Sequence, residues 1–313
     1  LDDDSARRLH TSKAKLDEIY SDRGEGYSYA SRLGRRLNHY PLEVVERIPF
    51  IFETESREAY RSLLSYLRPD NMIAILVAKG VQTTEKEKYF GTDYSYSEDE
   101  EFYTTLLDLP AEAELDLPEP NPFMPREATI PDRVQKEGVK PAKLISEEGL
   151  VLYHSADFEF LRPKASLIYK IRVPKERMNL RFKVLLDTYT TCVNESLNEL
   201  AYPARLAGLN YSFGGDFEGV NFSISGFDES VSKLFTHVLD HMQNLRISGE
   251  TFEALRDRSV RKWRNFTKQD AYRIARFVNY EVLQEVEFKP EEQLGVVQVL
   301  TLKDVQDFAK TLY

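Results

Sequence analysis

Cysteine is nearly absent from the sequence: Cys192 is the only one among 313 residues. A single cysteine excludes an intramolecular disulfide and any zinc site built from several cysteines. The lone thiol fits a reducing compartment, but an oxidising compartment permits disulfides without requiring them. The compartment is therefore left open between cytoplasm and periplasm.

Excess positive charge and long apolar runs are lacking as well. The 42 Lys and Arg residues are outnumbered by 52 Asp and Glu, which gives a net charge of −10. This balance argues against a nucleic-acid binder, which needs a positive footprint, and against attraction to anionic membranes. No apolar run reaches the length of a membrane span. We expect a soluble protein that binds neither nucleic acid nor membrane, and, because the chain begins at Leu1 without an initiator methionine, a fragment of a larger one.

The composition is that of a globular protein, and the length allows about two domains. Residues up to about 68 have apolar positions at helical spacing, which predicts several helices. The continuous apolar run 72–78 (MIAILVA) has the length of a buried strand. Acidic residues and prolines then accumulate over residues 98–140, which predicts an extended connector with a short helix near residues 99–108.

Residues 141–313 show strand patterns and helix patterns in an order typical of an α+β domain. The predicted elements are strands at 150–154, 166–173, 210–213 and 220–227 and a long helix at about 179–207. Apolar and polar residues alternate in the fourth strand, which predicts one buried and one polar face. The segment Gly214-Gly215-Asp216 suits the turn of a hairpin between the last two strands. We expect an antiparallel or mixed sheet with helices packed on one face.

One motif has the spacing of a zinc site. His237 and His241 lie four residues apart with Asp240 beside the second, similar to the inverted zincin pattern H-x-x-E-H. Against this hypothesis, aspartate is one methylene shorter than glutamate. His237 and His241 flank a strong apolar stripe and Asp240 lies well away from its centre, which is where solvated side chains belong. The available third ligands are Glu281, Glu285 and Glu287. We therefore prefer a solvated helix flank to a metal site.

The other candidates are weaker. His10, His39 and His154 are scattered and have no partner at ligand spacing. Cys192 lies inside the predicted long helix and is interpreted as a buried structural thiol. A basic run around Trp263 could bind an acidic partner, but a solvated helix face is the preferred interpretation. That run comprises Arg258, Arg261, Lys262, Arg264 and Lys268. Residue chemistry alone therefore predicts no catalytic, cofactor-binding or metal residue.

Several segments, in order along the chain, resemble the insulinase (pitrilysin-type) family of zinc peptidases. They are residues 64–71 (LSYLRPDN), 89–94 (YFGTDY), 117–125 (LPEPNPFMP) and 196–211 (SLNELAYPARLAGLNY). The resemblance implies a parent of four homologous α+β domains that enclose a chamber, with the zinc helix in the first. It places residues 1–97 at the end of the second domain, 98–140 in the connector, and 141–313 in a third domain that lacks its last strand.

What the resemblance implies for function is a non-catalytic middle portion of a zinc metalloendopeptidase that degrades peptides. The fragment would form chamber wall and packing scaffold, and would itself be inactive and free of zinc. Its partners would be peptide substrates in the chamber, the other domains of the chain, and a possible homo-oligomer. Two alternatives remain: a non-catalytic scaffold or partner-binding subunit of the same fold, and an independent metallohydrolase using His237, Asp240 and His241. The family's zinc helix precedes its strand hairpin, whereas this motif follows the predicted one.

Overall fold

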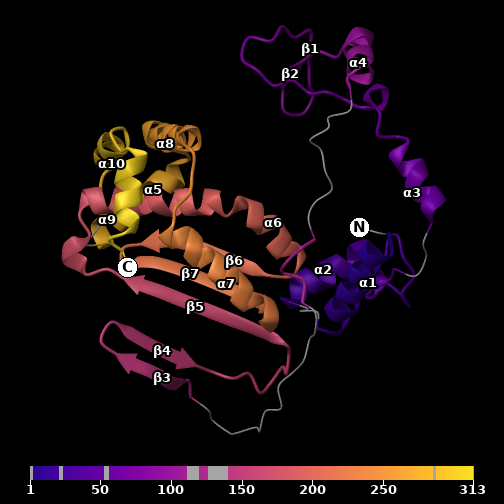
Figure 1. The fold of residues 1–313 in the computed structure, drawn as a ribbon. Coiled ribbons are helices and arrows are strands. Elements are labelled where there is room, and N and C mark those ends of the chain that lie inside the picture. Colours follow the sequence, from indigo (N-terminus) through magenta and orange to yellow (C-terminus); the bar gives the residue numbers. More distant parts are fainter. Residues whose placement is uncertain are drawn as a thin grey trace. The chain divides into compact units, whose positions relative to one another are not determined.

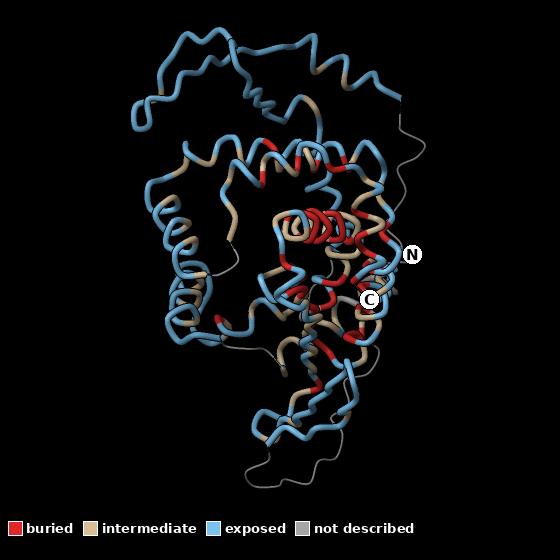
Figure 2. Tube along the Cα trace, turned by 90° about the vertical axis from the view of Figure 1, so that its left-hand side faces the viewer, coloured by how far each residue is buried: buried red, intermediate tan, exposed pale blue. Residues whose placement is uncertain are grey.

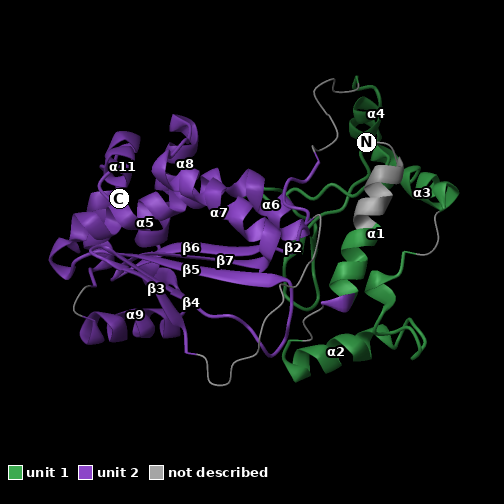
Figure 3. Cartoon of the chain, turned by 60° about the horizontal axis from the view of Figure 1, so that its bottom comes forward, with its two compact units in different colours: residues 1–18, 23–119 green, residues 19–22, 120–313 purple. Residues whose placement is uncertain are grey.

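The computed structural model describes residues 3–20, 24–52, 56–110, 120–125, 140–284 and 287–312. The chain divides into two compact units, which Figure 3 shows in different colours. Unit 1 comprises Leu1–Glu18 and Arg23–Glu119, and unit 2 comprises Ile19–Asp22 and Pro120–Tyr313. No helix in the described ranges is both long enough and apolar enough to cross a membrane.

Unit 1 contains three α-helices among the described residues up to position 68, where the sequence predicts helices, and one more beyond it. Its α-helices are α1 (Asp3–Ile19, the last residue in unit 2), α2 (Gly26–Arg36), α3 (Arg57–Leu64) and α4 (Glu100–Leu107), and a short hairpin pairs β1 (Glu85–Lys86) with β2 (Asp93–Tyr94). Helix α4 confirms the short helix expected near residues 99–108, and the Asp99 side chain caps it by accepting from the Phe102 N–H. Among the unit 1 residues whose side chains are described, only Ala14 and Val45 are buried apolar residues.

The buried strand predicted at residues 72–78 is wrong for this structure. The segment has no regular secondary structure, and its backbone from residue 73 to 78 has no hydrogen bond within the described part of the chain. Its apolar side chains are exposed, with 91% of Val77 accessible to solvent. The physical reason is that the described part of unit 1 has only the two-residue strands β1 and β2, which pair with each other, so this strand-forming sequence lies without a partner.

Unit 2 contains a three-stranded antiparallel sheet in the order β5-β7-β6 (Figure 1). The strands are β5 (Lys164–Arg172), β6 (Asn210–Asp216) and β7 (Gly219–Phe227). A separate antiparallel hairpin pairs β3 (Ala142–Glu147) with β4 (Leu150–His154). Strands β4 to β7 confirm the predicted order of strands and the predicted hairpin of β6 and β7, whereas β3 was not predicted.

The two faces of the three-stranded sheet differ as the alternation predicts. Val220, Phe222 and Ile224 of β7 are buried, while the intervening Asn221 and Ser223 are half-exposed. The register places Leu167, Tyr169 and Ile171 of β5 beside the buried β7 residues, so they share the apolar face. That face packs against helices, and the other face is polar.

Within the described residues, seven α-helices complete unit 2. They are α5 (Leu180–Ser196), α6 (Asn198–Leu206), α7 (Asp228–Gln243), α8 (Gly249–Arg264), α9 (Ala271–Leu283), α10 (Pro290–Val297) and α11 (Leu302–Ala309). All of them except α9 contribute buried residues. The single helix predicted at 179–207 is divided at Leu197, whose N–H is shared between the Val193 and Asn194 carbonyls. Buried residues from the sheet and helices form one core, red in Figure 2, which contains Tyr189, Leu234 and Phe252.

The turn of the β6–β7 hairpin differs from its prediction. Gly214 and Gly215 lie inside β6, and the two-residue turn is Phe217-Glu218, because Asp216 pairs with Gly219. Gly215 is needed for packing: a Cβ there would lie 2.9 Å from Leu186 Cγ. The glycines therefore let the strand lie close to α5, a use that a glycine pair does not distinguish from a turn.

Part of the predicted connector is anchored in unit 2. Phe123 is fully buried and belongs to the core of that unit. Its carbonyl oxygen accepts a hydrogen bond from Ser230 Oγ at 2.6 Å, and Asn121 Nδ2 donates to the Pro203 carbonyl at 2.7 Å. Residues 120–125 therefore contribute to the stability of the α+β unit.

Candidate functional site

The His237-x-x-Asp240-His241 motif lies on α7, the helix after the β6–β7 hairpin. Asp240 is exposed and is engaged near the end of its own helix: its carboxylate accepts from Asn244 Nδ2 at 2.9 Å and lies 3.8 Å from Arg246 Nη2. A general base that activates a metal-bound water needs a carboxylate directed to that water. The observed partners give Asp240 a different role, at the C-terminal end of α7.

The two histidines of the motif have separate partners. His237 is exposed, and its ring meets Phe123 edge-to-face with the centroids 5.8 Å apart. His241 is half-buried, and its Nδ1 lies 3.1 Å from Ser196 Oγ. Burial lowers the pKa of His241 below its ordinary value, with smaller contributions from the nearby charges of His237 and Arg246. Both rings are accounted for by packing and a hydrogen bond.

The proposed third ligands do not join this pair within the described residues. Glu281 lies on α9, and Glu287 accepts a hydrogen bond from the Phe288 N–H just before α10. Glu285 lies outside the described residues. In the ranges that the structure describes, no group of three or more His, Cys, Asp or Glu side chains is arranged to hold a metal ion. That the motif is not a metal site stays a prediction, tested below.

The remaining candidates also lie apart. His154 is exposed at the end of β4, His39 lies beside Tyr40 in unit 1, and the side chain of His10 lies outside the described residues. Cys192 is fully buried on α5, where desolvation, aided by the charge of Glu195, raises the pKa of its thiol to about 12. A nucleophilic cysteine requires a lowered pKa and access to solvent, so Cys192 is a structural residue.

A polar cavity of about 230 Å³ lies between α5, α8 and α10. Its lining residues are Val184, Asp187, Thr188, Thr190, Thr191, Ser259, Lys262, Trp263, Gln293 and Val297. Helix α5 is the long helix between β5 and the β6–β7 hairpin, the position at which the family resemblance places a zinc helix in the catalytic domain. By this correspondence, zinc ligands of this unit would be expected to line the cavity on α5.

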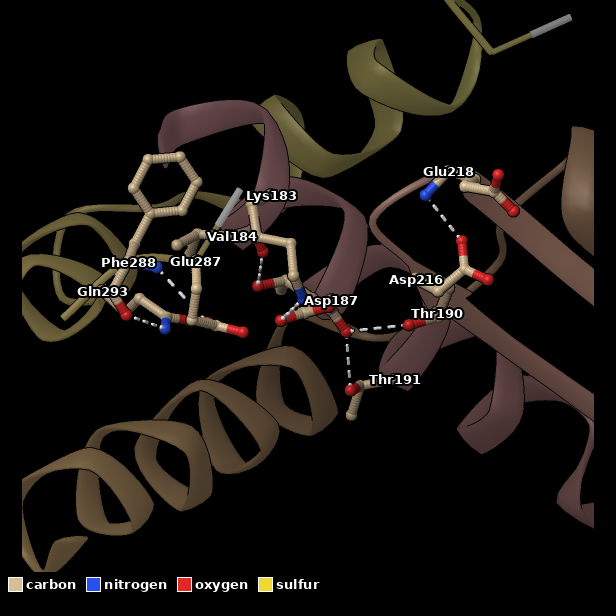
Figure 4. Close-up of polar contacts among 11 residues, drawn as sticks. Lys183, Val184, Asp187, Thr190, Thr191, Asp216, Glu218, Glu287, Phe288 and Gln293 are labelled. Carbon is tan, nitrogen blue, oxygen red and sulfur yellow. Dashed lines mark hydrogen bonds and ion pairs between the residues drawn. The ribbon is translucent and has the colours of Figure 1, made fainter. Parts of the chain in front are cut away.

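Several polar groups of the cavity lining are hydrogen-bonded to neighbouring residues, as Figure 4 shows for Asp187 and Gln293. Lys183, one helical turn before Asp187, donates from its Nζ to both carboxylate oxygens of Asp187 at 2.6 Å. The hydroxyls of Thr190 and Thr191 donate to the Asp187 carbonyl at 3.1 and 2.8 Å. Gln293 is buried, and its Nε2 donates to the Phe288 carbonyl at 2.7 Å.

These residues do not fit zinc. A protein zinc site uses at least three ligands from histidine, cysteine and carboxylate side chains. The cavity lining offers one carboxylate, Asp187, and that group is neutralised by Lys183; Lys262, whose Nζ lies 4.5 Å from the centre of the Trp263 ring, adds a further positive charge. No catalytic step can be derived from this cavity.

The comparison with protein families decides what kind of unit this is. Residues 19–296 match the family described as the middle or third domain of peptidase M16. The chain belongs to this family. An M16 middle domain is the segment that the resemblance predicted, so that prediction is confirmed.

Relatives of this M16 middle domain are much longer proteins. The chain is 27% identical over 291 residues to the putative zinc protease mug138 of Schizosaccharomyces pombe, covering 91% of this chain and 30% of that protein. It is 25% identical over 297 residues to the insulin-degrading enzyme of Homo sapiens, covering 94% of this chain and 29% of that protein. The chain therefore spans about 30% of the length of these relatives.

A solved structure confirms the fold class. The crystal structure of pitrilysin superposes with a TM-score of 0.69 and 18% identity, over 97% of this chain and 33% of that one. The pitrilysin-type α+β architecture is thus shown for this chain. Sequence reasoning missed the cavity on α5 and the anchoring of Phe123. The Lys183–Asp187 pair at i, i+4 was readable from the sequence, but its place at a cavity was not.

Proposed function

We propose that this chain is the non-catalytic middle portion of a zinc metalloendopeptidase that degrades peptides. Within that protein it would supply chamber wall and a scaffold against which the other domains pack. The match to the M16 middle domain, together with relatives that include a putative zinc protease and insulin-degrading enzymes, is the observation that carries the proposal. Zinc and its ligands would be supplied by a different part of the whole protein.

The chemistry of α5 supports the non-catalytic part of the proposal. A helix that held zinc would present histidines and a glutamate at the cavity. In their place stand Asp187, bound to Lys183, and three threonines, two of which donate to the backbone carbonyl of Asp187. An ammonium group this close would oppose a dication electrostatically.

The polar face of the β5-β7-β6 sheet supports a role as wall. Asn221 and Ser223 of β7 and Lys170 of β5 lie on the face away from the core. Lys170 pairs with both Asp216 and Glu218, which ties the hairpin to β5 and raises the pKa of the lysine, chiefly through its hydrogen bond to Glu218. A charged, hydrated sheet face can border a water-filled chamber without needing a covering layer.

The exposed apolar segments of unit 1 support the proposed domain boundaries. We assign residues 1–97 to the end of a second domain, 98–140 to the connector, and 141–313 to a third domain lacking its last strand. Only two apolar residues are buried among the described side chains of unit 1, while 72–78 is apolar and exposed. A unit this poor in core is expected to require the rest of its domain for stability.

The proposal is tested on the whole protein. We expect it to cleave peptides, to lose that activity on removal of zinc by a chelator and to regain it on zinc addition. We expect the amino-acid sequence of the whole protein to contain an H-x-x-E-H motif on the N-terminal side of Leu1. Absence of that motif together with absence of cleavage would favour the alternative, a non-catalytic scaffold subunit of the same fold.

The independent metallohydrolase has its own test. The whole protein carrying both His237→Ala and His241→Ala is compared with a control carrying His39→Ala and His154→Ala. We expect both proteins to cleave peptides at the unchanged rate. Loss of cleavage and of bound zinc in the first protein alone would show that α7 holds the catalytic metal.

A further inference from the structure

Buried polar side chains gather at the cavity between α5, α8 and α10. Among the described residues, the buried polar side chains are Thr188, Thr190, Ser230 and Gln293. Ser230 donates to the Phe123 carbonyl, whereas the other three all line the cavity. Polar groups are buried at low cost only when they have hydrogen-bond partners, so a cavity that collects them requires polar contents.

Gln293 has a hydrogen-bond acceptor that lacks a donor. Its side chain is 2% exposed, and its Nε2 donates to the Phe288 carbonyl at 2.7 Å. Because a carbonyl oxygen only accepts, this bond fixes which end of the Gln293 amide is the nitrogen. In the part of the chain that the structure describes, no group donates to Gln293 Oε1, and this oxygen borders the cavity. A buried acceptor without a donor is destabilising, so the contents of the cavity are required to donate to Gln293.

The threonines of α5 also present acceptors to the cavity (Figure 4). Thr188 Oγ1 donates to the Val184 carbonyl at 2.7 Å. Thr190 and Thr191 donate to the Asp187 carbonyl at 3.1 and 2.8 Å. Each hydroxyl has one proton, so the oxygen lone pairs are what these side chains can offer to a ligand. The walls formed by α5 and α10 therefore favour a ligand with hydrogen-bond donors and disfavour one that has only acceptors, such as sulfate.

The wall formed by α8 has the opposite chemistry. Lys262 is exposed, so the cavity leads from the surface at Lys262 to the buried Gln293. The Lys183 ammonium beside the cavity is paired with Asp187, but no carboxylate of the described residues lies within ion-pair distance of Lys262. The cavity therefore has one positive charge without a counter-ion, which attracts an anion.

The size of the cavity limits the ligand. Its volume of about 230 Å³ lies below the roughly 300–1,000 Å³ of pockets that bind drug-sized molecules. A sphere of this volume is about 8 Å across, which matches a chain of about six carbons with bonds of about 1.5 Å. One small molecule can therefore contact both Lys262 and Gln293.

We propose that this cavity binds a small hydroxycarboxylic acid as its monoanion. The carboxylate pairs with Lys262, while hydroxyl groups donate to Gln293 Oε1 and to the threonine oxygens of α5. A simple carboxylate would leave Gln293 without a donor, and an uncharged polyol would leave Lys262 without a counter-ion. The site lies within unit 2 and does not depend on whether the whole protein cleaves peptides.

Trp263 reports binding directly, because it lines the cavity and is the only tryptophan in the chain. The full 313-residue chain is titrated with matched six-carbon compounds while the fluorescence and the indole N–H resonance of Trp263 are recorded. D-Gluconate has a carboxylate and hydroxyls, hexanoate lacks the hydroxyls, and D-sorbitol lacks the carboxylate. We expect a saturable change with D-gluconate at a dissociation constant of about 1 mM or lower. We expect hexanoate and D-sorbitol each to bind at least about 10-fold more weakly.

Variants test the two ends of the site. Lys262→Gln removes the charge at an exposed position, and Lys268→Gln is the matched control, because Lys268 is also exposed but does not line the cavity. We expect Lys262→Gln to weaken D-gluconate binding at least about 10-fold and the control to change it less than about 2-fold. Gln293→Met removes the acceptor and should abolish most of the preference for D-gluconate over hexanoate. Where that variant does not fold, the two compounds in the unchanged chain test the same hydrogen bond.

Several results would overturn the proposal. No saturable change with D-gluconate would show that the cavity holds water only. Hexanoate or sulfate binding as tightly as D-gluconate would show that an anion pairs with Lys262 without donating to Gln293. D-Sorbitol binding as tightly would remove the role of the charge. Equal losses in Lys262→Gln and Lys268→Gln would place the anion on the general positive charge of α8 and not in the cavity.

Discussion

Phe123 provides a direct test of how residues 120–125 contribute to unit 2. Its side chain is fully buried in the core of unit 2, yet the first α-helix of that unit after Phe123, α5, begins only at Leu180. Phe-to-Ala substitutions at buried sites cost about 3–5 kcal/mol, because transfer and cavity terms add. The ring of His237, which contacts the Phe123 ring, is exposed, so the structure around Phe123 can relax in part. We therefore expect Phe123→Ala to lower the free energy of unfolding by about 3 kcal/mol.

The assay uses the single tryptophan, Trp263, which lies in α8 of unit 2 and reports the unfolding of that unit in urea. With a slope of about 2–3 kcal/mol per molar urea, the expected loss moves the midpoint down by about 1–1.5 M. Phe160→Ala is the control, because Phe160 is 61% exposed in the same unit, and we expect a shift below about 0.3 M. Equal small shifts for both variants would refute the assignment of Phe123 to the core.

Three further predictions concern single residues of unit 2. Gly219→Ala should lower the free energy of unfolding by at least about 2 kcal/mol in urea titrations, because φ is +132° and a Cβ would collide with the Ile171 carbonyl. The control Gly214→Ala should lower it clearly less, because no neighbouring atom lies within 4 Å of the added Cβ. Equal losses for the two variants would contradict this prediction. Burial lowers the pKa of His241 from 6.5, so below about pH 6.5 the unfolded state binds more protons and the free energy of unfolding falls as the pH drops. His241→Gln should reduce the slope of the unfolding free energy against pH. The same slope in both proteins from about pH 7.5 to 5 would refute this prediction. Cys192, with a pKa of about 12, should react with an aromatic disulfide only after unfolding; equal rates in water and urea would show that the thiol is accessible.

Local patterns in the sequence predicted the parts of the fold whose partners lie nearby. The alternation of Val220, Phe222 and Ile224 with polar residues predicted the buried face of β7 correctly. The apolar stripe of α7 likewise identified its packed side, with Leu234 and Val238 buried. Each of these patterns is decided by the period of a single element.

Features that depend on distant partners could not be predicted in this way. The apolar run 72–78 reads as a buried strand because its composition favours strand pairing. Pairing itself requires a partner, and the strands in the described part of unit 1, β1 and β2, pair only with each other. The glycine pair 214–215 reads as a turn, but contact with Leu186 of α5 explains Gly215. The cavity at Asp187 is built from three helices, and no spacing within one of them reveals it.

The location of zinc tests the central claim most directly. Zinc is measured by elemental analysis, per mole of protein, in this chain alone and in the whole protein purified under the same conditions. The proposal predicts about one zinc in the whole protein, unchanged by the His237→Ala, His241→Ala double substitution, and none retained by this chain after dialysis. Stoichiometric zinc in the isolated chain, removed by that double substitution, would contradict the claim that this middle portion is non-catalytic.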